Sequence, residues 1–395
     1  LHVVKEDPVR ADLLYVGSEF GLWVSPDSGS RWAAFQGGNF PSVAVRDLAI
    51  QPRDHDLVVA THGRGIWILD DLTPLRQLGP EQLAQEACLV SSRPTQQRMP
   101  AGGGWVEGDA KFIGENPAGG AVIHFYQQKR HIYGPLKLEI FDSKGQLLDT
   151  LPVPKRRGLS RIVWSMRHKA PKVPKAASIA GASLSGPRVL PGSYRVRVTK
   201  GDKTYECPLI IGLDRRATYT SQDRQLQLAA CQRVGLLFER MSQVVDDLRK
   251  LEQQCQQRTD SAPCQAMLPE LAELRKKLVA TTEGGAITGE ERLREKLDSL
   301  YASLNGYEGR PASYQLDYLK VLENDFAQVE KTSQKLLQTT NQLLQQQGQQ
   351  PLRILAGELP DANTARLLDQ LVREQPLDSP PAAPAASRRR SRKAR

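Results

Sequence analysis

A repeat near the N-terminus is the feature that most limits what this chain can fold into. DLLYVGSEFGLWVSPD begins at Asp12, and DLVVATHGRGIWILDD begins 44 residues later, at Asp56. Apolar and polar residues alternate within both copies, which predicts short β-strands. A period of about 44 residues filled with such strands is typical of a β-propeller blade, so residues 1–75 are predicted to be two blades. The equivalent Trp23 and Trp67 are expected to pack between neighbouring blades.

The stretch SPDSGSRW contains a turn motif at residues 25–32. Ser25, Asp27, Gly29 and Trp32 match the Asp-box pattern Ser-x-Asp-x-Gly-x-Thr-Trp. We expect Asp27 to accept hydrogen bonds from backbone N–H groups, Gly29 to take a positive φ, and Trp32 to cover the turn. Arg31 stands at the usual threonine position, so one capping hydroxyl is lost and a looser turn is expected. Asp27 is therefore interpreted as structural rather than catalytic.

These residues, with THGRGIWILDDLTPL, resemble the BNR/Asp-box repeat proteins, specifically the bacterial sortilin-like propeller proteins often labelled glycosyl hydrolases. The resemblance covers residues 12–75. It implies a propeller with the Asp-box on its outer rim, away from the central site, and a secreted, periplasmic or cell-envelope location. It implies no activity by itself, because Asp-boxes occur in sialidases and in binding propellers.

Two blades cannot close a ring, since a propeller needs about four or more. The remaining blades are expected upstream of Leu1, and the chain is interpreted as the C-terminal portion of a longer protein. The absence of a visible signal peptide is therefore uninformative.

Beyond residue 75 the pattern changes three times. Residues 76–109 are predicted to be a linker. Residues 110–213 carry alternating runs such as PGSYRVRV and LEIFDSKGQLLDTL, which resemble Ig-like modules and predict an Ig-like β-sandwich. Within it, HKAPKVPKAASIAGASLSGPRVLPG is expected to be a flexible loop.

Apolar residues then recur at helical spacing and predict an antiparallel α-helical bundle over residues 218–348. TSQD at 220–223 and TGEE at 288–291 are predicted N-terminal capping boxes. Residues 349–395 are expected to form a short helix and then a disordered Pro/Ala linker and basic tail. This tail, SRRRSRKAR, could make weak, non-specific contacts with anions.

Few residues carry a chemical signature. The loop THGRG is a candidate ligand-binding loop, because Arg64 could hold a carboxylate or sulfate beside His62; the alternative is a plain strand-to-strand turn. Asp70 and Asp71 are adjacent on a strand, so they do not predict the facing pair of a glycosidase. Cys255 and Cys264 either form a disulfide between two helices or are free thiols. The cysteine and histidine spacing predicts no metal site, and no cofactor motif is recognised.

The sequence thus predicts a non-catalytic binding or scaffolding protein of the cell envelope or exterior, which recognises a protein or glycan through its propeller. The alternative is a sialidase-like glycoside hydrolase whose active site lies on blades outside this chain. No membrane span is expected, because no apolar run reaches about 18 residues.

Overall fold

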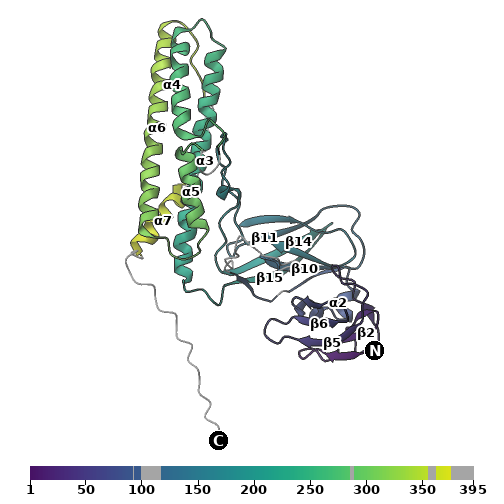
Figure 1. Cartoon of the computed structure of the whole chain (residues 1–395). Coiled ribbons are helices and arrows are strands. Elements are labelled where there is room, and N and C mark those ends of the chain that lie inside the picture. The colour runs from purple at the N-terminus through teal and green to yellow at the C-terminus, as the bar shows by residue number, and fades with distance from the viewer. Residues whose placement is uncertain (92, 99–116, 285–288, 355–361, 375–395) are drawn as a thin grey trace. The chain divides into compact units, whose positions relative to one another are not determined.

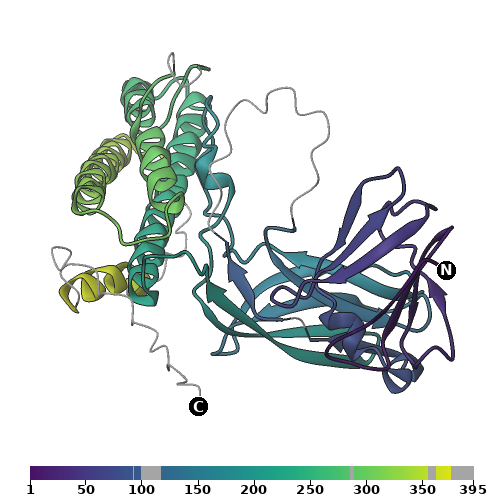
Figure 2. The same cartoon turned by 60° about the horizontal axis from the view of Figure 1, so that its bottom comes forward.

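The structure is a computed structural model that describes residues 1–91, 93–98, 117–284, 289–354 and 362–374. The chain divides into two units, Leu1–Met166 with Pro191–Arg216, and Arg167–Leu190 with Ala217–Arg395. The first holds the β-strands and the second the long helices (Figure 1, Figure 2). The mixed fold class, antiparallel sheets followed by a helical region, is confirmed.

Both copies of the repeat fold as antiparallel meanders. The first repeat sheet has four strands, β1 (Val3–Glu6), β2 (Leu14–Ser18), β3 (Gly21–Ser25) and β4 (Ala33–Ala34). The second has three, β5 (Val45–Ile50), β6 (Leu57–Thr61) and β7 (Ile66–Leu69). Strands are neighbours in chain order in both sheets, so the sequence repeat is also a structural repeat.

Cross-strand pairing identifies equivalent faces of the two sheets. Val4, Val16 and Trp23 are paired neighbours in the first sheet, and Leu48, Val59 and Trp67 are paired neighbours in the second. We call these the back faces. The opposite, front faces carry the pairs Tyr15–Val24 and Val58–Ile68.

The front face of the first sheet packs against the back face of the second. Tyr15 and Leu22 lie in one buried cluster with Leu48 and Val59. Trp67 packs on this cluster, with its ring centroid 5.4 Å from that of Phe40.

The other face of each repeat sheet is partly exposed, although Val16 on the back of the first sheet is buried. Trp23, the equivalent of Trp67, is 37% exposed on the back of the first sheet, and Val4 is 59% exposed beside it. Ile66 and Ile68 on the front of the second sheet are 72% and 59% exposed. Trp67 lies between the two sheets, whereas the expectation that Trp23 packs against a neighbouring blade stays a prediction.

Residues 76–109 were predicted to be a linker, but their described part is largely structured. The short helices α1 (Thr73–Gln77) and α2 (Pro80–Ala84) follow the repeat. β8 (Ala87–Val90) and β9 (Thr95–Gln97) then join the sheets of the next region.

That region consists of two further sheets. Its other strands are β10 (Ala121–Gln127), β11 (Leu136–Phe141), β12 (Leu147–Pro152), β13 (Gly158–Trp164), β14 (Gly192–Lys200) and β15 (Lys203–Leu213). One sheet has the order β13-β10-β8 and the other β12-β11-β14-β15-β9, in which β9 and β15 are parallel. Phe125 stacks edge-on against Tyr205, and Trp164 against Tyr194, so the two sheets face one another.

The helical unit contains α3 (Ser221–Gln256), α4 (Ala262–Leu278), α5 (Leu293–Asn305), α6 (Ser313–Gln346) and α7 (Ala362–Glu374). The capping box at the start of α3 is confirmed, because Asp223 N–H donates to Thr220 Oγ1 and Thr220 N–H donates to Asp223 Oδ2. α5 begins at Leu293 with Arg292 as its N-cap, so the TGEE sequence does not cap it; Thr288 lies outside the described residues.

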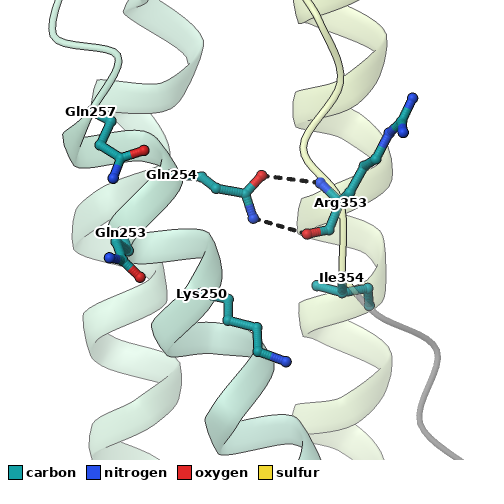
Figure 3. A pocket seen from close by; sticks show the side chains of 6 residues that line it. All are labelled: Lys250, Gln253, Gln254, Gln257, Arg353 and Ile354. Carbon is teal, nitrogen blue, oxygen red and sulfur yellow. Dashed lines mark hydrogen bonds between the residues drawn. The ribbon is translucent and has the colours of Figure 1, made fainter.

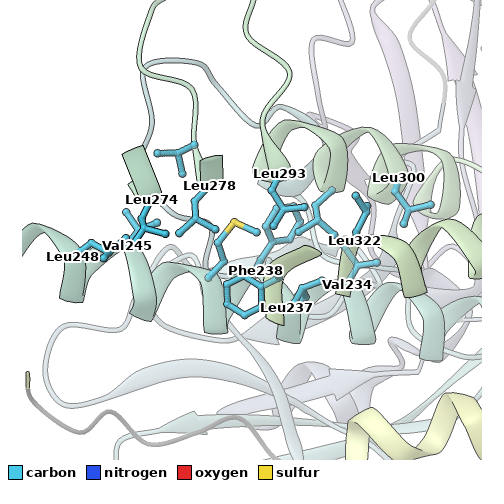
Figure 4. Close-up of a cluster of buried hydrophobic side chains, with 14 of the residues drawn as sticks. Val234, Leu237, Phe238, Val245, Leu248, Leu274, Leu278, Leu293, Leu300 and Leu322 are labelled. Carbon is cyan, nitrogen blue, oxygen red and sulfur yellow. The ribbon is translucent and has the colours of Figure 1, made fainter. Parts of the chain in front are cut away.

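Helices α3, α4, α5 and α6 share one apolar core. Val234 and Phe238 of α3, Leu274 and Leu278 of α4, Leu293 of α5 and Leu322 of α6 belong to it (Figure 4). The bundle prediction is confirmed in this general form. Among the described residues, no helix combines the length and apolar character needed to cross a membrane. The predicted disordered tail falls on residues 375–395, which lie outside the described residues.

The segment expected to be a flexible loop in the sandwich belongs to the helical unit instead. Residues 167–190, which we call the strap, leave the strands after β13 and return before β14. The strap contains one short 3-10 helix, η1 (Ala182–Leu184), and is otherwise irregular. Side chains of α3 and α5 bond to its backbone, which holds it in a defined path.

The packing of the repeat sheets predicts different roles for two equivalent tryptophans. We expect Trp67→Ala to lower the free energy of unfolding of the strand-containing unit by about 2–4 kcal/mol, because it empties a packed site between the sheets. Trp23→Ala should cost less than about 1 kcal/mol, since its face is open. Denaturant unfolding of the two variants checks this; equal losses would contradict the packing.

Candidate binding surface at the turns of the repeat

The turn between β3 and β4 is built around Asp27. Ser25 Oγ donates to Asp27 Oδ1 at 2.9 Å, and Gly29 N–H donates to Ser25 Oγ at 2.9 Å. Gly29 has φ +86°, and Trp32 Nε1–H donates to the Gly29 carbonyl at 3.0 Å. The structure thus brings the four Asp-box residues together in one hydrogen-bonded turn.

Arg31 replaces the missing threonine more fully than expected. Its backbone N–H donates to Asp27 Oδ1 at 2.9 Å, and its Nε–H donates to Asp27 Oδ2 at 2.8 Å. The side-chain bond from Arg31 is the largest cause that holds the pKa of Asp27 below its usual value. Both oxygens of the carboxylate are engaged, which fits a structural role.

His62 and Arg64 lie at the opposite end of the repeat sheets from the Asp-box. Leu14 pairs with Ser25 near the Asp-box, whereas Ser18 pairs with Gly21 at the far end of the same hairpin. The equivalent turn of the second sheet runs through residues 62–65. Its glycines, Gly63 and Gly65, have φ +81° and +71°, so the turn needs them for its shape.

Other side chains reach the same end of the sheets as His62 and Arg64. His2 Nε2–H donates to Glu19 Oε2 at 2.6 Å, and Arg46 Nη1 lies 3.1 Å from His2 Nδ1. Phe20, beside Glu19, is 79% exposed. We call this set the turn-end surface: His2, Glu19, Phe20, Arg46, His62 and Arg64.

The turn-end surface is basic. The hydrogen bond from His2 is the largest cause that lowers the pKa of Glu19, and the charges of Arg46 and His62 lower it further. Glu19 is therefore ionised at neutral pH and already engaged. His2, His62 and Arg46 lie around it, and Arg64 is exposed in the turn of the second sheet, so the surface attracts anionic groups, which arginine can bind with two parallel hydrogen bonds.

A second charged cluster lies at the Asp-box end of the sheets. Arg93 Nε is 3.7 Å from Asp71 Oδ2, and Arg215 Nη2 donates to Asp54 Oδ1 at 3.3 Å. Arg161 Nη2 lies 4.0 Å from Asp70 Oδ2. The adjacent Asp70 and Asp71 thus contact different arginines and do not act as a facing pair.

Two groups near this cluster have perturbed pKa values. Burial raises the pKa of Asp70, and the neighbouring charge of Asp56 adds to that shift. Burial lowers the pKa of His124 to about 4, so this histidine is neutral at pH 7. Arg93, Arg161 and Arg215 come from segments that follow the repeat, so their contacts link the repeat to the rest of its unit.

Cys255 of α3 and Cys264 of α4 are both fully buried and are free thiols in the structure. Burial raises the pKa of Cys255 to about 12, and a hydrogen bond with Cys264 contributes. The Cys255 thiol is therefore protonated at neutral pH, and the pairing of the two cysteines as a disulfide stays a prediction.

A shallow hollow of about 460 Å³ lies in the helical unit between α3 and the segment after α6. Gln254 bonds to both the backbone N–H and the carbonyl of Arg353 across it (Figure 3). Because both the N–H and the oxygen of the Gln254 amide are used in these bonds, this side chain is not available to bind a ligand in the hollow. Within the part of the chain that the structure describes, no group of three or more His, Cys, Asp or Glu side chains could hold a metal ion.

No family model, curated protein or solved structure matches the chain.

The sequence pattern indicated His62 and Arg64 but not their neighbours. Glu19 and Phe20 occupy the equivalent turn of the first copy, so the repeat itself was a signal that could have found them. His2 and Arg46 carry no such signal, because they reach the surface from strands whose pairing brings distant residues together.

The Asp-box geometry predicts a pH-dependent contribution to stability. The pKa of Asp27 is lower in the folded chain than its unfolded value of about 3.9. The ionised carboxylate therefore stabilises the folded state fully above that unfolded pKa, and this stabilisation is lost as the pH falls through the lower folded pKa. We expect Asp27→Ala to lower the Tm at pH 7 by a few degrees, and the difference from the unchanged chain to shrink below about pH 4.

Thermal unfolding followed by circular dichroism from pH 2 to pH 8 measures this difference. Asp202, exposed at the tip of the β14–β15 turn, provides the control, and Asp202→Ala should leave the Tm unchanged. A Tm that is unaffected by Asp27→Ala at pH 7 would show that the carboxylate does not stabilise the turn.

Proposed function

We propose that this chain belongs to a non-catalytic binding or scaffolding protein of the cell envelope or exterior, and that its repeat sheets are blades of a β-propeller. The front-to-back packing of the two sheets carries this proposal. The front of one sheet packs on the back of the next, which is a heterologous contact. Each added sheet therefore leaves a front face exposed, to which the back of a further sheet can bind. The open back of the first sheet and the open front of the second fit further sheets of this kind.

Additional sheets would complete the ring, since about four or more are needed. They would cover Ile66 and Ile68 in the way that the second sheet covers Tyr15 and Leu22. The two facing sheets that follow, with three and five strands, fit an Ig-like sandwich that acts as a spacer or docking module.

The turn-end surface is the proposed contact with the ligand. Arg46, half-exposed, and Arg64, exposed, provide guanidinium groups for a carboxylate or sulfate. Phe20 offers an exposed aromatic ring beside them. This combination suits an acidic segment of a protein or an acidic glycan.

A glycoside hydrolase is less well supported by the same surface. A glycosidase needs a protonated carboxylic acid near neutral pH, and its environment must raise the pKa of that acid. Glu19 shows the opposite shift, caused by its bond with His2 and by nearby positive charge. The observed electrostatics therefore favour binding.

Charge reversal on the turn-end surface tests the binding function. We expect Arg46→Glu with Arg64→Glu to weaken binding to a heparin oligosaccharide or a glutamate-rich peptide at least tenfold at low salt, because two guanidinium contacts become repulsive. Binding by the unchanged chain should fall as salt rises. Fluorescence anisotropy with the labelled probes measures both effects.

Arg53 provides the matched control, because it is an exposed arginine at the opposite end of the second repeat sheet. Arg53→Glu should leave binding unchanged. Equal losses from both substitutions would place the interaction elsewhere, and hydrolysis of the oligosaccharide by the intact protein would favour the enzyme instead.

A further inference from the structure

The strap follows α3 and α5 over much of its length. Pro171 and Pro174 restrict φ in its first half and favour an extended backbone. Pro171 Cβ lies 3.5 Å from the position that a Cβ would take at Gly235 of α3. The strap therefore lies directly against this helix.

Side chains of α3 bind backbone carbonyl groups of the strap. Ser242 Oγ donates to the Lys172 carbonyl at 3.0 Å, and Arg249 Nη2 donates to the Lys175 carbonyl at 2.9 Å. Ser242 and Arg249 are seven residues apart, so they lie on one face of α3. Both hydrogen bonds are made to backbone carbonyl groups of the strap and not to its side chains.

Side chains of α5 bind the backbone of the second half of the strap and also the hydroxyl groups of Ser178 and Ser183. Asp298 accepts hydrogen bonds from the backbone N–H groups of Ala182 at 3.3 Å and Ser183 at 2.9 Å. Tyr301 Oη donates to the Ser185 carbonyl at 2.9 Å. Arg294, a further member of α5, donates to the Ser178 carbonyl at 2.8 Å.

The strap also makes apolar contacts with the helical unit, through a few small side chains. Val173, Ala176 and Ala182 pack against the core of the helical unit. Ile179 and Leu184 instead point outward, at 84% and 74% exposure. A segment that is irregular apart from η1, with its backbone bonded, a few small side chains buried and larger ones exposed, has the form of a bound peptide.

We propose that α3 and α5 form a peptide-binding groove, that the strap is its tethered ligand, and that a separate peptide of sequence 168–186 fills the groove when the strap is released. The groove selects segments with proline and small residues that can form the η1 turn at Asp298, because the positions packed on the core hold valine and alanine. This site is independent of the turn-end surface and of the proposed propeller.

Release of the strap without damage to the groove tests the proposal. Val173→Asp with Ala176→Asp places two charges against the apolar core and leaves Ser242, Arg249 and Asp298 in place. We expect a fluorescein-labelled peptide 168–186 to bind this full-length variant at least tenfold more tightly than the unchanged chain. Adding Asp298→Ala should weaken that binding at least tenfold.

Trypsin provides a second measurement, because Lys172 and Lys175 lie within the strap. Arg249→Ala should speed cleavage after these lysines at least threefold. Arg240→Ala should not, since Arg240 lies on the same helix but pairs with Glu330 at 2.7 Å. These two variants leave the strap sequence unchanged. They therefore test the proposal even if the variant with Val173→Asp and Ala176→Asp fails to fold.

Two results would overturn the proposal. One is equal peptide binding by the unchanged chain and by a Val173→Asp, Ala176→Asp variant that keeps its helical circular dichroism. The other is equal trypsin cleavage of the Arg249→Ala and Arg240→Ala variants.

Discussion

The close approach of β2 and β5 controls the arrangement of the whole repeat. A Cβ at Gly17 would lie 2.7 Å from both Val45 Cγ1 and the Val45 carbonyl oxygen, so any larger residue would push the sheets apart. At this separation Tyr15 and Leu22 reach the back of the second sheet and are buried. The same contact aligns the turns of both sheets, so that the basic turn-end surface gathers at one end and the Asp-box lies at the other.

The repeat in the sequence predicted the strands of both sheets but not their register. By sequence, Tyr15 aligns with Val59, whereas by strand pairing Val16 is the equivalent of Val59. The cause is one extra residue in the second turn, since His62, Gly63 and Arg64 lie between Thr61 and Gly65 where two residues lie between Ser18 and Gly21. A shift of one residue exchanges the two faces of a strand. The open and packed faces could therefore be assigned only from the structure.

Elsewhere, predictions from the sequence agree with the structure where the structure is determined by residues close together in the chain. The Asp-box turn and the Thr220 cap depend on residues a few positions apart, and both formed as expected. The strap has no periodic pattern and is rich in Pro, Gly and Lys, so it was predicted to be a flexible loop. Its order comes from helix side chains far away in sequence, such as Asp298, which no local pattern reveals. His2 and Arg46 were missed at the turn-end surface for the same reason.

The bond between Ser183 and Asp298 spans 115 residues, and this separation affects how the protein is made. At about 5–20 residues per second, a ribosome needs about 6–23 s to synthesise α5 after the strap has been added. Throughout that interval the bonds between the strap and α5 cannot form. Cotranslational folding of the helical unit must therefore wait for α5, so slow translation after residue 190 would lengthen the period in which proteases and chaperones can act on this segment.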